Sequence, residues 1–147
     1  MFVRRFRGYD LDRILSIENA AFSQPFSEDT IIGLLSIGAV ILVATVDEYL
    51  VAYIQFWVKN NEGHIISIAC DPEYRNQGIS TKLMERTLEV FELAQISIVK
   101  LEVRTSNTKA IQFYKKLGFQ EEYIEENYYE NNENAIIMSR PSHIKKS

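Results

Sequence analysis

Residues 75–80 are the stretch whose residue types most clearly suggest ligand binding, and they lie between a strand-like run and an amphipathic helix. A helix that starts there exposes unpaired backbone N–H groups at the positive end of its dipole. Gly78 has no Cβ and lets a ligand approach the backbone, while the guanidinium of Arg75 suits a phosphate. These properties predict a pyrophosphate cradle, against the alternative of an ordinary helix start with a solvated arginine. The stretch consists of Arg75, Asn76, Gln77, Gly78, Ile79 and Ser80.

Two familiar phosphate-binding motifs do not fit this stretch. A Walker A loop requires more glycine and a Gly-Lys-Ser/Thr ending, and neither is present. A dinucleotide-binding loop requires three spaced glycines, whereas only Gly78 is present.

Three further residues could move protons. Glu102 alternates with Lys100 and Arg104 on one face of a predicted strand, where a central strand would ordinarily be apolar. A carboxylate in this place needs a reason, and an ion pair with Lys100 or Arg104 is the structural explanation for it. Tyr114 stands on the apolar face of a helix and could be a core aromatic. His64 could be a surface histidine, and no other cysteine or histidine stands at metal-ligand spacing.

The remaining candidates also have plain structural readings. Cys70 follows a predicted strand beside the glycine loop; it could be a nucleophile, but a small buried apolar filler is favoured. Asn107 is a good helix N-cap. Lys116 could reach phosphates or simply be solvated.

The elements that must position these residues follow from hydrophobic periodicity. Strands are expected over 2–6, 40–46, 50–58, 64–69 and 98–104, with a final hairpin of 119–129 and 135–138 around 131–134. Helices are expected over 10–22, from N-cap Ser27, after the glycine loop, and from Asn107 to Gly118. The turns are expected at 47–48 and 60–63. The order predicts an α/β domain with a mixed sheet.

Composition restricts the class of protein. The 147 residues suggest one domain over 1–141, followed by a short basic tail, 142–147, that is expected to be disordered. A net charge of −4 disfavours nucleic acid as a partner. The single cysteine, the missing signal sequence and the missing apolar span suggest a soluble cytoplasmic protein, a monomer or weak dimer.

Two motifs together resemble the GNAT superfamily of acetyl-CoA-dependent N-acetyltransferases. RNQGIS is similar to the family's R-x-x-G-x-[GAS] loop, with Ser80 where glycine or alanine is frequent. LEVRTSNTKAIQFYKKLGF, residues 101–119, resembles its second signature. With NYYENNENAIIM and EGHIISIAC, the chain looks like the branch that acetylates protein N-termini, which contains RimI-type ribosomal-protein-alanine acetyltransferases and archaeal N-terminal acetyltransferases. The histidine of EGHIISIAC favours the archaeal, broader type.

The resemblance implies a GNAT fold: a mixed, mostly antiparallel sheet with helices on both faces and a splay between its two central strands. It implies acetyl-CoA as co-substrate and no metal. The CoA-binding residues it implies are Ile68, Ala69, Cys70, Arg75, Asn76, Gln77, Gly78, Ile79, Ser80, Thr81, Asn107, Tyr114 and Lys116.

The resemblance also implies how acetyl transfer takes place. Glu102 is implied as general base, with His64 as an alternative base, and Tyr114 as general acid to the thiolate. Pro25 and Phe26, and Tyr128 and Tyr129, are implied to line the peptide site, with hairpin packing as the alternative for the tyrosines.

The expected function is acetylation of protein N-termini, with nascent chains or ribosomal proteins among the substrates. Two alternatives stay open: acetylation of lysine or a small amine, and a non-catalytic CoA-binding regulatory module. A need for an auxiliary subunit is also left open.

Overall fold

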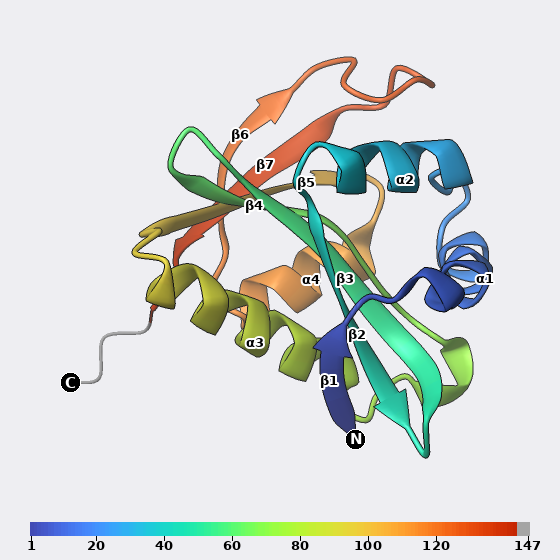
Figure 1. Ribbon diagram of the computed structural model, residues 1–147. Helices are drawn as coiled ribbons and strands as arrows, with labels where there is room; N and C mark the ends of the chain where they lie inside the picture. Colours follow the sequence, from blue (N-terminus) through green and yellow to red (C-terminus); the bar gives the residue numbers. More distant parts are fainter. Residues whose placement is uncertain (144–147) are drawn as a thin grey trace. The chain divides into compact units, whose positions relative to one another are not determined.

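The computed structural model describes residues 1–143 (Figure 1). The chain divides into two compact units. The first unit consists of Met1–Trp57 and Ile66–Thr87. The second consists of Val58–Ile65 and the chain from Leu88 onward. The single domain expected over 1–141 stays a prediction.

The first unit contains three antiparallel strands: β1 (Phe2–Arg5), β2 (Val40–Val46) and β3 (Tyr49–Lys59), the last of these as far as Trp57. β2 and β3 form the predicted hairpin, whose turn residues Asp47 and Glu48 both have positive φ, at 50° and 67°. Two consecutive positive φ values give the turn the twist that a two-residue hairpin needs. β-branched and aromatic residues make these strands suitable for burial, and most of their side chains are buried.

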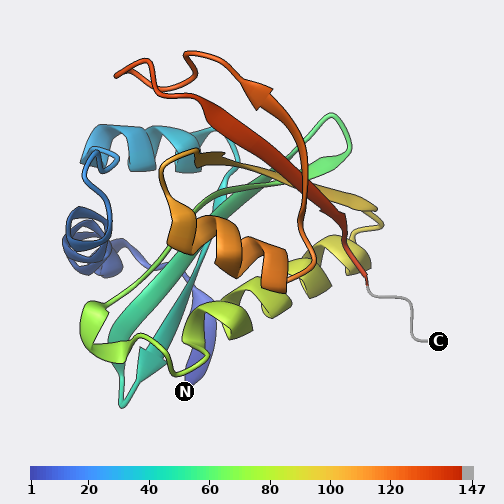
Figure 2. The same cartoon turned by 180° about the vertical axis from the view of Figure 1, so that it is seen from behind.

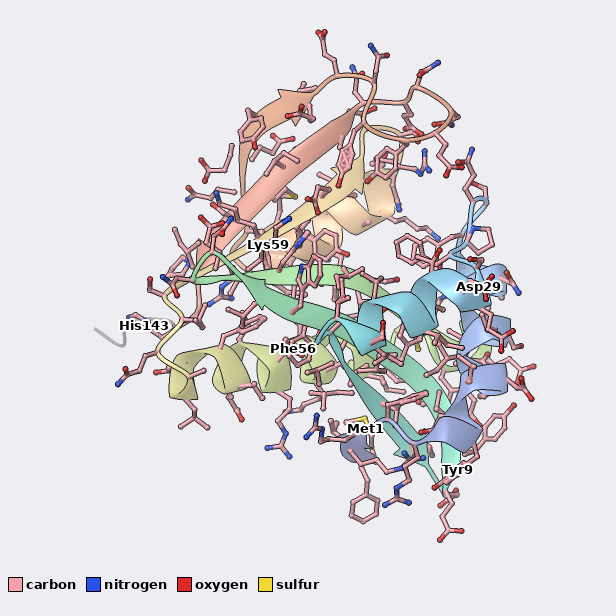
Figure 3. The ribbon with its side chains drawn as sticks, turned by 45° about the horizontal axis from the view of Figure 1, so that its top comes forward. Met1, Tyr9, Asp29, Phe56, Lys59 and His143 are labelled. Carbon is pink, nitrogen blue, oxygen red and sulfur yellow. The ribbon has the colours of Figure 1, made fainter. Side chains whose placement is uncertain are left out.

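Helices α1 (Leu11–Ala21) and α2 (Glu28–Ser36) belong to the first unit. Ser27 caps α2 as predicted, because its side chain accepts a hydrogen bond from the N–H of Thr30 at 3.2 Å. Figure 3 shows Asp29 at the end of α2 where the α1–α2 loop enters the helix. The core of this unit joins both helices to the strands through Ile14, Ile17, Ile31, Ile41, Val43, Leu50, Tyr53 and Ala69.

Strand β4 (Glu62–Cys70) and helix α3 (Ile79–Leu93) each contribute residues to both units. β4 begins earlier than expected, because the turn needs only Asn60 and Asn61, both at positive φ. The predicted turn over 60–63 was therefore too long. Gly63 is then a strand residue, and a Cβ on it would lie 2.8 Å from the Phe91 ring. Close packing of α3 against β4 within the second unit thus requires glycine here.

The sequence predicts one helical face for α3 that consists of Ile79, Leu83, Thr87, Val90, Phe91 and Ala94. This prediction is partly wrong, because Val90 is 40% exposed and Ala94 is also exposed. Met84 and Leu88, which the prediction omitted, are buried. The other predicted positions are buried as expected: Ile79, Leu83, Thr87 and Phe91.

The second unit also contains β5 (Ile98–Arg104), β6 (Gln120–Glu125) and β7 (Ala135–Pro141). β4 pairs with β5 in parallel through Gly63–Ile65, and β7 pairs antiparallel with both β5 and β6. Hydrogen bonding links all strands in the order β1-β2-β3-β4-β5-β7-β6. The mixed, mostly antiparallel sheet expected from the sequence is confirmed.

Helix α4 (Thr108–Lys116) lies against the β5 and β7 strands of the second unit (Figure 2). Asn107 caps it as predicted, accepting a hydrogen bond from the N–H of Ala110 at 3.2 Å. Gly118 ends it with φ +93°, a conformation that favours glycine. Buried Arg140 of β7 donates to the carbonyl of Leu117, which fixes the helix end to the sheet.

The final hairpin differs from its prediction. β6 ends at Glu125, so Tyr128 and Tyr129 lie in the connecting loop and not in a strand. β7 continues to Pro141, and the N–H of Ser142 donates to the carbonyl of Ser97 at 3.0 Å. Residues 144–147 of the predicted tail lie outside the described residues.

Candidate active site

The glycine loop of the first unit joins a short helix, η2 (Pro72–Tyr74), to α3. Asn76 and Gly78 both have positive φ, at 64° and 76°, so the chain turns sharply before the helix. A Cβ on Gly78 would meet no atom within 4 Å, which leaves the backbone open to a ligand. The first N–H groups of α3 follow immediately, at Ile79, Ser80 and Thr81. The local geometry therefore suits an anion, as predicted.

The end of β4 contains the three residues expected to bind the pantetheine arm. The register with β5 involves Gly63–Ile65, so Ile68, Ala69 and Cys70 lie beyond the paired residues. Cys70 is 8% exposed, and burial raises the pKa of its thiol against the opposing effect of Arg75. A thiol kept protonated in this way is a poor nucleophile, which favours the filler reading of Cys70.

Helix α1 holds the chain that precedes the glycine loop. Arg13 donates through Nη2 to the carboxylate of Asp71 and through Nε to the carbonyl of Leu50, the latter at 2.8 Å. The N–H of Glu73, at 2.9 Å, and the guanidinium of Arg13 lower the pKa of Asp71. The N–H of Asp71 itself donates to the carbonyl of Val51 at 2.7 Å. These bonds fix the point from which the loop leaves β4.

In the second unit, Glu102 and His64 form a pair. Glu102 Oε2 lies 2.5 Å from His64 Nε2, and each side chain is about one quarter exposed. His64 is opposite Lys100 in the parallel register, so Glu102 lies two residues further on the same face. A hydrogen-bonded carboxylate and imidazole that touch solvent can accept a proton from a substrate, directly or through a water molecule.

The structural alternative for Glu102 was an ion pair with its strand neighbours. Lys100 instead pairs with Glu62 at 3.3 Å, and Arg104 pairs with Glu133 at 3.1 Å. The carboxylate of Glu102 is occupied by His64, a residue on the neighbouring strand.

Tyr114 projects from α4 into a buried environment beside Phe113 and Phe119. Burial, with a smaller effect of Tyr129, raises the pKa of its phenol far above the ordinary value. The hydroxyl therefore stays protonated at any pH at which the protein works. A protonated phenol can donate a proton to a strongly basic leaving group.

The loop between β6 and β7 brings two tyrosines to the same region of the second unit. The Tyr128 and Tyr129 rings lie 5.0 Å apart, and the Arg104 guanidinium stacks 3.8 Å from the Tyr129 ring centre. Burial and the charge and hydrogen bond of Glu102 raise the pKa of Tyr128. Burial raises the pKa of Tyr129 to about 12, against the influence of Arg104. Glu102, Tyr128 and Tyr129 thus form one connected group, and Tyr129 also acts electrostatically on Tyr114.

Not every predicted site residue gains a role from the geometry. The amide oxygen of Asn107 caps α4, which is its structural reading. Lys116 is exposed at the last turn of α4. Their contacts with CoA stay predictions.

Pro25 and Phe26 lie in the loop between α1 and α2 of the first unit, where both are exposed. The N–H of Phe26 donates at 2.9 Å to Glu18, a residue the sequence did not single out for function. Glu18 is 2% exposed and lies among the apolar residues of α1. A glutamate on the buried face of an amphipathic helix was the signal that could have identified it.

Within residues 1–143, no group of three or more His, Cys, Asp or Glu side chains could hold a metal ion. Among the same residues, no helix is long and apolar enough to cross a membrane.

Comparison with known proteins gives consistent results over nearly the whole chain. The chain is 38% identical over 141 residues to an "uncharacterized N-acetyltransferase" of Methanocaldococcus jannaschii, covering 94% of this chain and 90% of the relative. It is 34% identical over 153 residues to an N-alpha-acetyltransferase of Sulfurisphaera tokodaii, covering 95% and 92%. The structure of the ribosomal-protein-S18-alanine N-acetyltransferase from Escherichia coli superposes with a TM-score of 0.87 at 31% identity, covering 99% and 96%.

The acetyltransferase (GNAT) family matches residues 11–119, which include the glycine loop, Glu102 and Tyr114. The resemblance stated from the two sequence motifs is confirmed. The chain belongs to the acetyltransferase (GNAT) family.

Proposed function

We propose that this protein transfers the acetyl group of acetyl-CoA to the free α-amino group of protein N-termini. The observation that carries the proposal is the 2.5 Å pair of His64 and Glu102 in the same unit as the buried, protonated phenol of Tyr114. An acetyl transfer to an amine needs one group that accepts a proton and one that donates a proton.

The reaction proceeds by direct attack in a ternary complex. The Glu102–His64 pair accepts a proton from the α-ammonium, and the neutral amine attacks the thioester carbonyl. The carbon–sulfur bond breaks, and the CoA thiolate takes the phenolic proton of Tyr114. The attacking nitrogen loses its second proton to the Tyr114 phenolate as the amide forms, and the Glu102–His64 pair returns the first proton to solvent.

The residues proposed to bind acetyl-CoA are those of the glycine loop and its neighbours in the first unit, together with Asn107 and Lys116. The N–H groups at the start of α3, the open backbone of Gly78 and the charge of Arg75 suit the pyrophosphate. The backbone of Ile68, Ala69 and Cys70 suits the amides of the pantetheine arm. Asn76, Gln77, Asn107 and Lys116 complete the proposed contacts.

The choice of an α-amine over lysine rests on acidity and on the relatives. A terminal α-amine has a pKa of about 7.7–8.0, against about 10.4 for lysine, so a moderate base suffices. Two relatives are named as an N-alpha-acetyltransferase and a ribosomal-protein-S18-alanine N-acetyltransferase. Both names describe transfer to protein N-termini.

Two matched peptide sets test the proposal. One set has free N-termini and no lysine; the other has acetylated N-termini and one internal lysine. CoA release with the first set alone is the expected result, and the preference for the first side chain then separates narrow from broad specificity. Turnover with the second set alone would assign a lysine acetyltransferase. Acetyl-CoA binding without turnover on either set would favour a small-amine enzyme or a regulatory module.

A further inference from the structure

Glu18 is a buried carboxylate whose partners in residues 1–143 are neutral donors. Its Oε1 accepts hydrogen bonds from the hydroxyls of Tyr53 and Ser67, the latter at 3.1 Å. Its Oε2 accepts the N–H of Phe26 at 2.9 Å. Glu18, Tyr53 and Ser67 are 2%, 1% and 8% exposed. Burying a charge is costly unless several donors compensate it, so this arrangement calls for a purpose beyond packing.

Glu18 accepts hydrogen bonds from residues at both ends of the loop between α1 and α2. The carbonyl of Glu18 accepts the N–H of Phe22 at 3.1 Å where α1 ends, and its carboxylate accepts the N–H of Phe26. Ser27 then caps α2 directly after Phe26. The backbone of residues 22–27 is therefore fixed by Glu18 at both ends.

The aromatic ring of Phe26 is itself not buried. It remains 36% exposed, although its own backbone N–H is bonded to one of the most buried side chains of the unit. A loop that served only to connect two helices would not need a buried charge to hold an exposed aromatic ring. Rigid aromatic side chains at the surface are suited to contact a ligand at low entropic cost.

We propose that Glu18 is a positioning residue that holds Phe26 in place to select the first side chain of the acetylated peptide. The proposal rests on the proposed function, because it assigns Phe26 to the peptide site. Tyr53 and Ser67 hold the carboxylate from the strand side, and Glu18 transmits this fixed position to the loop.

Glu18→Gln is the most direct test. The glutamine oxygen can still accept from Tyr53 and Ser67, but its NH2 group then faces the N–H of Phe26, and two donors cannot bond. We expect KM for the peptide to rise about tenfold, as for the loss of one hydrogen bond to a charged acceptor. We expect KM for acetyl-CoA to stay unchanged, and the preference among first side chains to flatten.

Asp10→Asn is the matched control. Asp10 is also a buried carboxylate of the first unit, 4% exposed, and it also accepts a backbone N–H, that of Arg7 at 2.8 Å. It contacts Arg4 instead of the α1–α2 loop. This variant should lose stability without a change in peptide preference. If Glu18→Gln does not fold, Glu18→Asp takes its place in the test. Aspartate keeps the charge, but its shorter side chain reaches less far toward the N–H of Phe26.

A double-mutant cycle with Phe26→Ala separates positioning from a general loss of stability. If Glu18 acts through Phe26, Glu18→Gln has little further effect on peptide KM or preference in the Phe26→Ala background. Additive effects, or an unchanged preference in Glu18→Gln while the wild type discriminates, would overturn this inference alone. If the wild type acetylates no free N-terminus, the proposed function and this inference fail together. Hydrogen exchange at the N–H of Phe26 in Glu18→Gln still shows, by a loss of protection, whether Glu18 anchors the loop.

Discussion

His64 Nε2 lies 2.5 Å from Glu102 Oε2, with the two residues on neighbouring parallel strands of the second unit. From the sequence, Glu102 was the favoured general base and His64 only an alternative. In the structure the two side chains form one hydrogen-bonded pair. Because the two side chains are hydrogen-bonded, replacing either one also removes a partner of the other.

Replacement of Glu102 tests the base. Glu102→Gln should lower kcat/KM by about 10²–10⁴-fold, because the amide cannot accept the proton of the substrate amine. His64→Gln should have a smaller effect if histidine only orients the carboxylate. The measurement is initial rate of CoA release with a free N-terminal peptide. Glu62→Gln is the control: Glu62 pairs with Lys100 on the same strands and should be dispensable. Full activity of Glu102→Gln would remove Glu102 from the mechanism.

Replacement of Tyr114 tests the acid. Tyr114→Phe keeps the ring and its contact with Phe119, and should lower kcat by about 10²-fold or more because the thiolate loses its proton donor. Since burial raises the phenol pKa, the proton-donating form persists as pH rises. The wild-type rate should therefore show no fall from Tyr114 ionisation up to about pH 10, the pKa of an ordinary tyrosine. Tyr123→Phe, an exposed tyrosine of β6, is the matched control.

Gly78→Ala tests the cofactor loop. The added methyl meets no protein atom, so the cost in stability comes from φ +76° alone and should be about 1 kcal/mol. The larger effect should be on acetyl-CoA, whose KM should rise because the methyl occupies the open side of the backbone. Gly33→Ala in exposed α2 also meets no atom but has no strained φ, and should leave KM unchanged while stabilising the helix. Equal KM values in both variants would argue against a ligand at Gly78.

Cys70→Ala tests direct transfer. Burial raises the pKa of the thiol, so a thiolate nucleophile is disfavoured at neutral pH. Activity should be retained within a few fold, and mass spectrometry of the wild type incubated with acetyl-CoA alone should show no acetyl-enzyme. An acetylated Cys70 that passes its acetyl group to peptide would establish a covalent intermediate instead.

The Asp71 carboxylate should contribute a pH-dependent part of stability. The N–H of Glu73 and the Arg13 guanidinium lower its folded pKa, so its contribution is present above the unfolded pKa of about 3.9 and is lost as pH falls through the folded value. Asp71→Asn should lower the free energy of unfolding by up to about 1 kcal/mol at pH 7. Denaturation at several pH values should show this difference shrinking in acid; a difference that does not depend on pH would contradict the assignment.

The sequence predicted most of the elements because their signals are local. The turns at Asp47 and Asn60, the cap at Asn107 and the stop at Gly118 each depend on a few neighbouring residues. The 126–134 loop was misjudged because Tyr128 and Tyr129 have strand propensity. In the structure their rings pack on each other outside any strand, and Arg104 stacks on Tyr129.

The side-chain contacts that form the site could not be predicted from the sequence, because they depend on how the strands are paired. His64 and Glu102 are 38 positions apart, and only the parallel pairing of β4 with β5 places them together. Glu18 reaches Tyr53 and Ser67, which are 35 and 49 positions away. Helical periodicity puts Glu18 on the same face as Ile14 and Ile17, but it does not indicate which residues this face will contact.

The most direct test of the central claim is an internal competition within one peptide. A peptide with a free N-terminus and one internal lysine is incubated with acetyl-CoA and the wild-type protein, and the acetylated nitrogen is located by fragmentation mass spectrometry. We expect a single acetyl group on the α-nitrogen, absent when Glu102→Gln replaces the wild type. Acetylation of the lysine side chain with the α-amine left free would contradict the account.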